Sequence, residues 1–189
     1  MRLKLLILLF FICISANSQK FATRAGKTSF IGSEQTFEQI KAVNDFSSAI
    51  IDSSNGDIAI LLFINAFNFE IALMQEHFNE NYMDSSKFPK ATFTGNIQSF
   101  KINEITDSDQ EYKINGVLTI RGIEKEVSLI SKIRRSNEAL LLKANFSVLT
   151  SDFDIKIPKV VRNKISKEIE IKVEYDLSLI HISEPTRPY

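Results

Sequence analysis

The chain has 189 residues, with 23 basic and 23 acidic side chains and one cysteine. This length is typical of one domain that buries its own hydrophobic core, and a balanced charge without a run of basic residues argues against nucleic acid as a partner. A single cysteine, Cys13, excludes an internal disulfide and a metal site with several thiolate ligands.

Residues 1–18 have the pattern of a secretory signal peptide. Two basic residues lie at the start, Leu5–Ile14 is uncharged, and small residues follow. The apolar run is shorter than the ~20 residues that a transmembrane helix needs. A lipoprotein signal that ends at Cys13 is disfavoured, because the two residues before it are bulky. We therefore expect a periplasmic or secreted bacterial protein that relies on its core rather than on disulfides.

The region after residue 18 is predicted to be mostly β-strand. Lys20–Arg24 and Lys27–Gly32 are expected to form two short strands around Gly26. Residues 35–40 are compatible with a turn or with a brief helix. Ala42–Asp52 follows as a longer strand.

A hairpin is predicted at Asn55-Gly56, because this dipeptide readily takes the positive φ angles of a two-residue turn. The following stretch, Asp57–Phe67, is apolar on both sides of the expected strand. A strand of this kind must be covered on both faces. We expect the helix that follows to provide this cover.

One short helix is predicted in an otherwise β-rich chain. Apolar residues recur at helical spacing only over Ile71–Phe78. Asn68 is expected to cap the first turn, and Glu70 to complement the positive end of the helix dipole. Pro89 prevents the helix from continuing into the next strand.

The rest of the chain shows the period-two alternation of strands that are buried on one face. Asn115-Gly116 lies within this pattern without a change of phase, which indicates a bulge or a close approach of two backbones rather than a turn. Pro158 is expected to keep Phe153–Lys164 irregular. The strands that the alternation predicts are Ala91–Gln98, Tyr112–Arg121, Val127–Arg135, Leu140–Val148 and Glu168–Tyr175.

These elements predict an all-β fold with one short helix. Strands of about ten residues span roughly 33 Å, which is longer than usual. About eight of them bury their apolar faces and leave no exposed edge if they close into an elongated antiparallel β-barrel. A sandwich buries the same faces, and periodicity alone does not separate the two architectures.

The end of the chain, residues 177–189, is excluded from this fold. Leu177–Arg187 resembles the translation of a sequencing adaptor, so we interpret these residues as non-native and expect the last strand to end near Asp176. A genuine tail without a strand is the alternative, because Pro185 and Pro188 would stop one.

Three stretches, in order along the chain, resemble the YceI-like family. Tyr112–Val127 is similar to its strand pair with the pattern Gly-x-Leu-Thr-Ile-x-Gly. His77–Phe93 is similar to its histidine element followed by an aromatic-Pro pair, and Ser151–Ile155 to its Ser-Asp-Phe-Gly-Ile segment. The resemblance implies one domain over residues 19–176, a lipocalin-like barrel whose apolar lumen holds a long isoprenoid or similar lipid in some members.

Two departures from the family pattern lie near the expected mouth of the lumen. Met74-Gln75 stands where the family often has Arg-Asp, and the spacing from His77 to Pro89 is about one residue shorter. The identity of the ligand therefore does not carry over from the family.

We expect the barrel to hold an apolar chain, an isoprenoid or a fatty lipid, with no other cofactor and no metal. Long strands lined by Phe, Leu and Ile make a tall apolar interior, and each buried CH₂ contributes about 0.8 kcal/mol. The alternative is a lumen filled by large side chains, which uses the same residues; the family resemblance favours binding. The ligand-binding residues that we predict are Phe69, Met74, His77, Phe78, Phe93, Leu118, Ile120, Leu142 and Phe146.

His77 is the one histidine of the expected domain and the candidate for acid–base chemistry, with Glu70, Glu76 or Glu80 as its partner. The sequence shows no nucleophile paired with a base, no metal-ligand spacing and no phosphate loop. A histidine that is hydrogen-bonded at the barrel rim is the simpler interpretation. We therefore predict that the protein is not an enzyme and has no catalytic residues.

An envelope module without a small ligand is the alternative function. Glu168, Glu170, Lys172 and Glu174 alternate with apolar residues and predict a charged outer face on the last strand. Such a face is usually solvated, and the sequence shows no exposed apolar patch for a partner. The sequence does not indicate an oligomeric state.

Overall fold

The computed structural model describes residues 19–33, 39–162 and 164–180. The predicted signal peptide, most of residues 35–40 and His181 lie outside these ranges. Within the described ranges, every helix is too short or too polar to cross a membrane.

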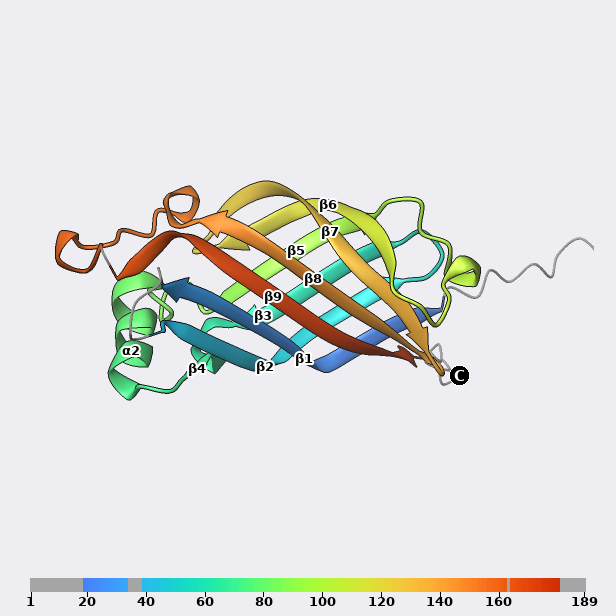
Figure 1. Ribbon diagram of the computed structural model, residues 1–189, viewed down its shortest axis with the longest axis horizontal. Coiled ribbons are helices and arrows are strands. Elements are labelled where there is room, and N and C mark those ends of the chain that lie inside the picture. Colours follow the sequence, from blue (N-terminus) through green and yellow to red (C-terminus); the bar gives the residue numbers. More distant parts are fainter. Residues whose placement is uncertain (1–18, 34–38, 163, 181–189) are drawn as a thin grey trace, which may run out of the picture.

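Eight strands form a closed antiparallel barrel (Figure 1). The ring closes because β1 pairs with both β2 and β9. The two-residue strand β4 (Asn68–Phe69) lies beside the start of β2. Closure confirms the predicted lipocalin-like barrel and excludes a sandwich of two open sheets. The barrel strands are β1 (Lys20–Ser33), β2 (Lys41–Asp52), β3 (Asp57–Phe63), β5 (Lys90–Ile97), β6 (Gln110–Ile120), β7 (Ile123–Ser136), β8 (Ala139–Leu149) and β9 (Ile165–Ile180).

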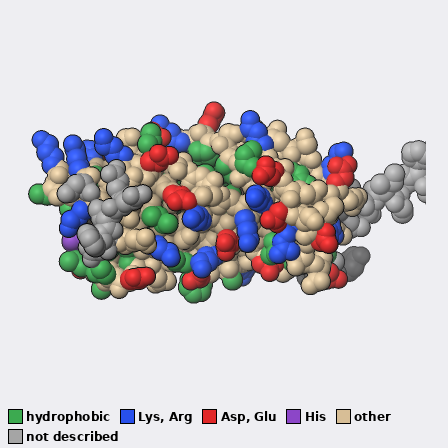
Figure 2. Space-filling model, viewed as in Figure 1, with side chains coloured by type: hydrophobic (Ala, Val, Ile, Leu, Met, Phe, Trp, Pro, Cys, Tyr) green, Lys and Arg blue, Asp and Glu red, His purple; other side chains and the backbone are tan. Residues whose placement is uncertain are grey.

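Alternation along the strands sends apolar side chains inward and charged ones outward. On β9, Val173, Tyr175 and Leu177 are buried, and the residues between them are exposed. On the outer face, Lys172 Nζ lies 3.2 Å from Glu170 Oε1. Figure 2 shows basic and acidic side chains interspersed over this outer wall. The charged face expected for the last strand is therefore present.

Strand β9 continues to Ile180, so the prediction that it ends near Asp176 is wrong. Leu177 is completely buried and pairs with Leu140, and Ser178 pairs with strands on both sides. The physical reason is that the inward alternation extends past Tyr175 while β8 and β1 still offer backbone partners.

Strand β1 is one continuous element rather than two short strands around Gly26. The register of β1 with β2 shifts on both sides of Gly26, which marks an irregularity in the ladder. A Cβ atom on Gly26 would lie 2.4 Å from Cδ1 of Tyr175. The glycine is therefore needed for the close packing of the Tyr175 ring and not for a turn.

The hairpin predicted at Asn55-Gly56 is present, but its turn is longer than two residues. Strand β2 ends at Asp52 and β3 begins at Asp57, and only Gly56 has a positive φ, of 77°. The side chain of Asn55 instead bonds Asp57: its amide donates to Oδ2 at 2.7 Å, and its Oδ1 accepts from the Asp57 N–H at 2.9 Å.

The predicted helix is α2 (Ala72–His77), and a π-helical turn over Phe78–Tyr82 extends it. Asn68 does not cap it, because residues 68 and 69 form β4 and are held by β2. Ile71 occupies the cap position without a side-chain hydrogen bond, and Glu70 precedes the helix. Asn68, which the sequence pattern assigns to the start of the helix, is therefore part of the sheet instead.

Helix α2 lies across one end of the barrel and does not cover the outer face of β3 (Figure 1). Strand β3 ends at Phe63, and the chain then turns through Ile64–Ala66. Phe63 points outward and is 44% exposed, with the Lys90 ammonium 5.5 Å from its ring centroid. The expectation that α2 covers the second face of this strand is wrong. The strand ends at Phe63, whose side chain stays partly exposed, and Phe67 is buried because it follows the Ile64–Ala66 turn and no longer belongs to the strand.

Asn115-Gly116 is a close approach and not a bulge. Gly116 pairs directly with Gly95, and the register of β5 with β6 is continuous on both sides. A Cβ atom on Gly116 would lie 2.4 Å from the carbonyl oxygen of Thr94 and 2.5 Å from Cζ of Phe93. The two glycines therefore leave room for the Phe93 ring inside the barrel.

The end of the barrel opposite α2 is filled with side chains. Ile105, from the loop that precedes β6, is buried at this end. The Arg135 guanidinium holds the same loop by donating a hydrogen bond to the Ile102 carbonyl at 2.8 Å. This half is a packed hydrophobic core. The buried side chains that fill it are Phe21, Ile51, Ile97, Ile133, Leu140 and Leu177.

Candidate ligand cavity

The half of the barrel nearer α2 contains a cavity of about 500 Å³. Its lining is almost entirely aliphatic and aromatic. The lumen is therefore filled at one end and hollow at the other. Neither an open lumen nor a lumen filled by side chains, the two alternatives from the sequence, describes the whole barrel. A cavity of this size and polarity lies within the range of about 300–1,000 Å³ that is usual for small-molecule sites.

All nine residues predicted to bind ligand line this cavity. Phe69, Met74, His77 and Phe78 come from the segment that includes α2, and the other five come from barrel strands. Strand alternation explains the second group, since each of the five occupies an inward position. Contact with a ligand remains a prediction for all of them.

Three buried hydroxyl groups lie at the boundary between the cavity and the filled half. The hydroxyl of Thr28 shares hydrogen bonds of 2.8 Å with Ser47 Oγ and with Tyr175 Oη. Thr28 and Tyr175 line the cavity, and all three side chains are almost completely buried. Burial raises the pKa of Tyr175 above its ordinary value, and the hydrogen bonds from Thr28 and Ser47 lower it by less. These three hydroxyl groups form hydrogen bonds with one another, so they do not need a bound ligand as a hydrogen-bond partner.

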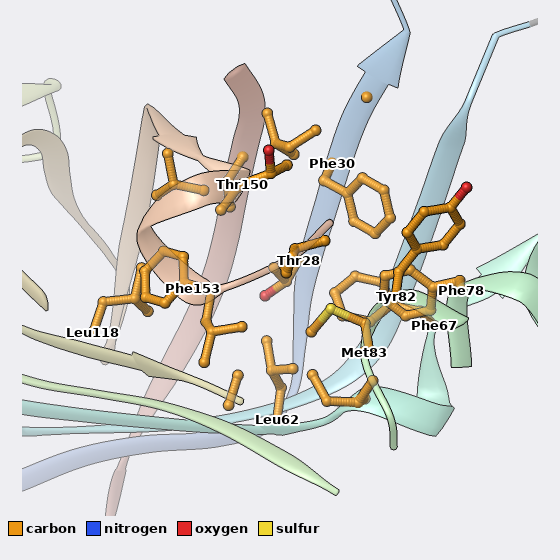
Figure 3. A pocket seen from close by; sticks show the side chains of 18 of the residues that line it. Thr28, Phe30, Leu62, Phe67, Phe78, Tyr82, Met83, Leu118, Thr150 and Phe153 are labelled. Carbon is orange, nitrogen blue, oxygen red and sulfur yellow. The ribbon is translucent and has the colours of Figure 1, made fainter. Parts of the chain in front are cut away.

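An aromatic cluster attaches the helical segment to the barrel. The Phe78 ring lies 5.4 Å from Phe30, 5.7 Å from Phe67 and 5.1 Å from Phe69, between ring centroids. Figure 3 shows Phe30, Phe67, Phe78, Tyr82 and Met83 gathered on one side of the cavity. Such aromatic pairs contribute about 0.5–1.5 kcal/mol each beyond the area they bury. The cluster therefore stabilises the packing of the helical segment against the barrel on this side of the cavity.

The opposite side is closed by the 3-10 turn over Thr150–Phe153. Phe153 is almost completely buried and points into the cavity (Figure 3). The Arg121 guanidinium donates to the carbonyls of Phe153 and Asp154 and lies 5.8 Å from the ring centroid of Phe88. The turn between β6 and β7 thus holds the Thr150–Phe153 turn, which contains the Ser-Asp-Phe segment of the family pattern, against the cavity.

The mouth of the cavity lies between α2 and the segment that leads into β9. Leu73 is 57% exposed on one side, and Ile157 and Val161 line the cavity from the other. Met74, at the departure from the family pattern, also lines the cavity. The Met74-Gln75 departure therefore lies in the segment of α2 beside the entrance, whereas the shortened stretch from His77 to Pro89 includes Met83, a buried residue of the cavity wall.

His77 lies at the rim, as predicted, but its imidazole makes no hydrogen bond to another residue of the described ranges. Its side chain is exposed and lines the mouth. Glu76 and Glu80 are exposed as well. Across the part of the chain that the structure describes, no group of three His, Cys, Asp or Glu side chains is placed to hold a metal ion.

Sequence reasoning did not identify several residues of the cavity wall. Tyr175 and Val173 could have been found, because they continue the inward alternation of β9. Phe153, Ile157 and Val161 carry no such signal, since they lie in irregular segments whose direction no periodicity predicts.

Comparison with known proteins agrees with this architecture. The family model of the YceI-like domain matches residues 16–177. The search of curated proteins found no match.

Three solved structures resemble the chain. A polyisoprenoid binding domain from Saccharophagus degradans, implicated in plant cell wall breakdown, is 14% identical with a TM-score of 0.74, covering 86% of this chain and 99% of that one. Burkholderia cenocepacia BcnA is 17% identical with a TM-score of 0.66, covering 82% and 96%. The Campylobacter jejuni YCEI protein is 19% identical with a TM-score of 0.57, covering 76% and 88%. At these identities the likeness shows the fold alone. With the family match over nearly the whole barrel, the chain belongs to the YceI-like family.

Proposed function

We propose that this protein is an exported carrier that holds one apolar chain, an isoprenoid or another lipid, in the cavity beside α2. The observation that carries the proposal is the cavity of about 500 Å³ with its almost wholly apolar wall. The polyisoprenoid binding domain of similar fold supports the class of guest. Export is supported by the signal-peptide pattern of residues 1–18.

The energetics favour a guest with a long hydrocarbon chain. Burial of about a dozen methylene groups would contribute roughly 10 kcal/mol. Association and immobilisation oppose binding by about 4–15 kcal/mol, so only a guest that fills most of the cavity binds firmly. A short apolar molecule is therefore expected to bind weakly.

Binding is favoured over catalysis because the cavity lacks a reactive pair among its described residues. His77 is exposed and makes no hydrogen bond there to a carboxylate or a hydroxyl. The buried hydroxyls of Thr28, Ser47 and Tyr175 bond to one another, and no base lies beside them to activate a nucleophile.

The test is extraction of the purified protein with organic solvent followed by mass spectrometry. We expect close to one lipid per protein molecule. Protein that has been unfolded in guanidinium, stripped of lipid and refolded is the control, and it should regain signal from a fluorescent polyene fatty acid. An empty extract together with a refolded protein that binds no such probe would refute the carrier function and favour the envelope module.

A further inference from the structure

A short arm, residues 156–162 and 164, projects beside the mouth of the cavity. It leaves the Thr150–Phe153 turn, passes Pro158 and the 3-10 turn Lys159–Val161, and enters β9. In Figure 1 this segment extends beyond the strands at the same end as α2. The arm is therefore the part of the described chain that reaches furthest from the barrel at the entrance.

The arm exposes an aliphatic side chain at its tip. Val160 is 87% exposed, the largest exposed fraction among the large hydrophobic residues that the structure describes as exposed. Its neighbours Ile157 and Val161 line the cavity. The same short segment thus presents apolar groups to solvent on one side and to the cavity on the other. A single exposed valine is ordinary, but Val160 adjoins the apolar entrance and so extends its apolar surface, and contiguous apolar surface of this kind marks an interaction site.

Positive charge surrounds this tip. Residues 156–167 contain five basic side chains and no acidic one, although the whole chain is neutral. Figure 2 shows basic side chains gathered at this end of the molecule. The one described ion pair in the segment joins Lys156 Nζ to Asp154 Oδ1 at 3.8 Å. The acidic side chains of the entrance, Glu70, Glu76 and Glu80, belong to the segment of α2 on the opposite side of the mouth. The basic side chains of the arm and of the start of β9, all exposed, are Lys156, Lys159, Arg162, Lys164 and Lys167.

We propose that the arm docks the cavity mouth onto an anionic phospholipid bilayer. Val160 enters the boundary between headgroups and acyl chains, and the basic side chains contact the headgroup phosphates. An acidic protein surface would satisfy the charges, but it would not account for an exposed aliphatic tip that is continuous with an apolar cavity. The use of this contact for lipid transfer rests on the proposed carrier function, whereas the docking itself does not.

The experiment is flotation of the protein with vesicles of phosphatidylcholine, with and without phosphatidylglycerol. We expect binding only when phosphatidylglycerol is present, and weaker binding as salt concentration rises. The variant Lys156→Gln/Lys159→Gln should lower the partition coefficient about 25-fold, since each basic side chain near an anionic surface contributes about fivefold. Its control is Lys113→Gln/Lys132→Gln, which removes the same charge from exposed positions on β6 and β7 and should leave binding unchanged.

The aliphatic tip has a separate test. Val160→Ser should weaken vesicle binding by up to about tenfold. The matched control Ile130→Ser alters a side chain on β7 that is 52% exposed, and it should have no effect. Circular dichroism on each variant should show an unchanged melting transition, because all the altered side chains are exposed.

Failure of the wild-type protein to bind vesicles that contain phosphatidylglycerol would overturn the docking proposal. Binding to soluble polyglutamate instead, lost in Lys156→Gln/Lys159→Gln and unaffected by Val160→Ser, would also overturn it and assign the arm to an acidic protein partner. Vesicle binding by a protein whose extract is empty would support docking while refuting the carrier function, so the two proposals fail separately.

Discussion

Replacement of Phe78 with alanine removes the ring that joins the helical segment to the barrel. Phe78 lies within 5.1–5.7 Å of three other phenylalanine rings, between centroids. Loss of a fully buried phenylalanine costs about 3–5 kcal/mol. Because Phe78 is only half-buried, we expect the free energy of unfolding to fall by roughly 2–3 kcal/mol, including the lost ring contacts.

Urea denaturation measures this loss, and hydrogen exchange followed by mass spectrometry locates it. Amides of residues 72–83 should exchange faster in Phe78→Ala, while those of β9 should change little, because the barrel ring does not depend on the cluster. Phe46→Ala is the matched control, since Phe46 is 65% exposed. Equal losses of stability in the two variants, or unchanged exchange over residues 72–83, would refute the view that the aromatic cluster holds α2 in place.

Three further predictions concern the barrel interior. Gly116→Ala should lower the free energy of unfolding, measured in urea, by about 2 kcal/mol or more, because the new Cβ would lie 2.4 Å from a backbone carbonyl oxygen. The control Gly32→Ala should lower it much less, because its nearest contact, at 3.2 Å, is the flexible end of the Ile169 side chain. Burial raises the pKa of Tyr175 in the folded state above its ordinary value of 10.0. Its contribution to stability is therefore fully present below pH 10 and lost as pH rises through the folded pKa, so the urea midpoint should fall less steeply above pH 10 in Tyr175→Phe than in wild type. Ala144→Phe should place a ring in the cavity and reduce the lipid recovered per protein without unfolding the barrel; undiminished recovery would show that the guest lies elsewhere.

Strand alternation carried most of the information about the fold and the cavity wall. Inward positions such as Leu118, Leu142 and Phe146 followed from period two, because neighbouring side chains of a strand point to opposite faces whatever the rest of the fold does. The family pattern added the residues of the helical segment. This explains why the predicted set lines one cavity although its members are far apart in the sequence.

Local signals failed where the sheet competes for the same residues. Asn68 has the chemistry of a helix cap, yet its backbone pairs with Val43 in the sheet. The last strand was expected to end near Asp176, yet Leu177 is completely buried between β8 and β1. In both cases a partner strand, distant in sequence, decided the local structure.

The class of fold, the face that each strand turns inward and the apolar character of the interior follow from the order of the amino acids alone. The packing of one end, the cavity at the other end and the position of the arm (residues 156–162 and 164) beside the entrance follow from tertiary contacts. The physical reason is that a void depends on the volumes of side chains from every strand of the ring at once, together with the loops that close its ends. The periodicity of the sequence describes one strand at a time and therefore does not give the combined volume of the side chains inside the barrel.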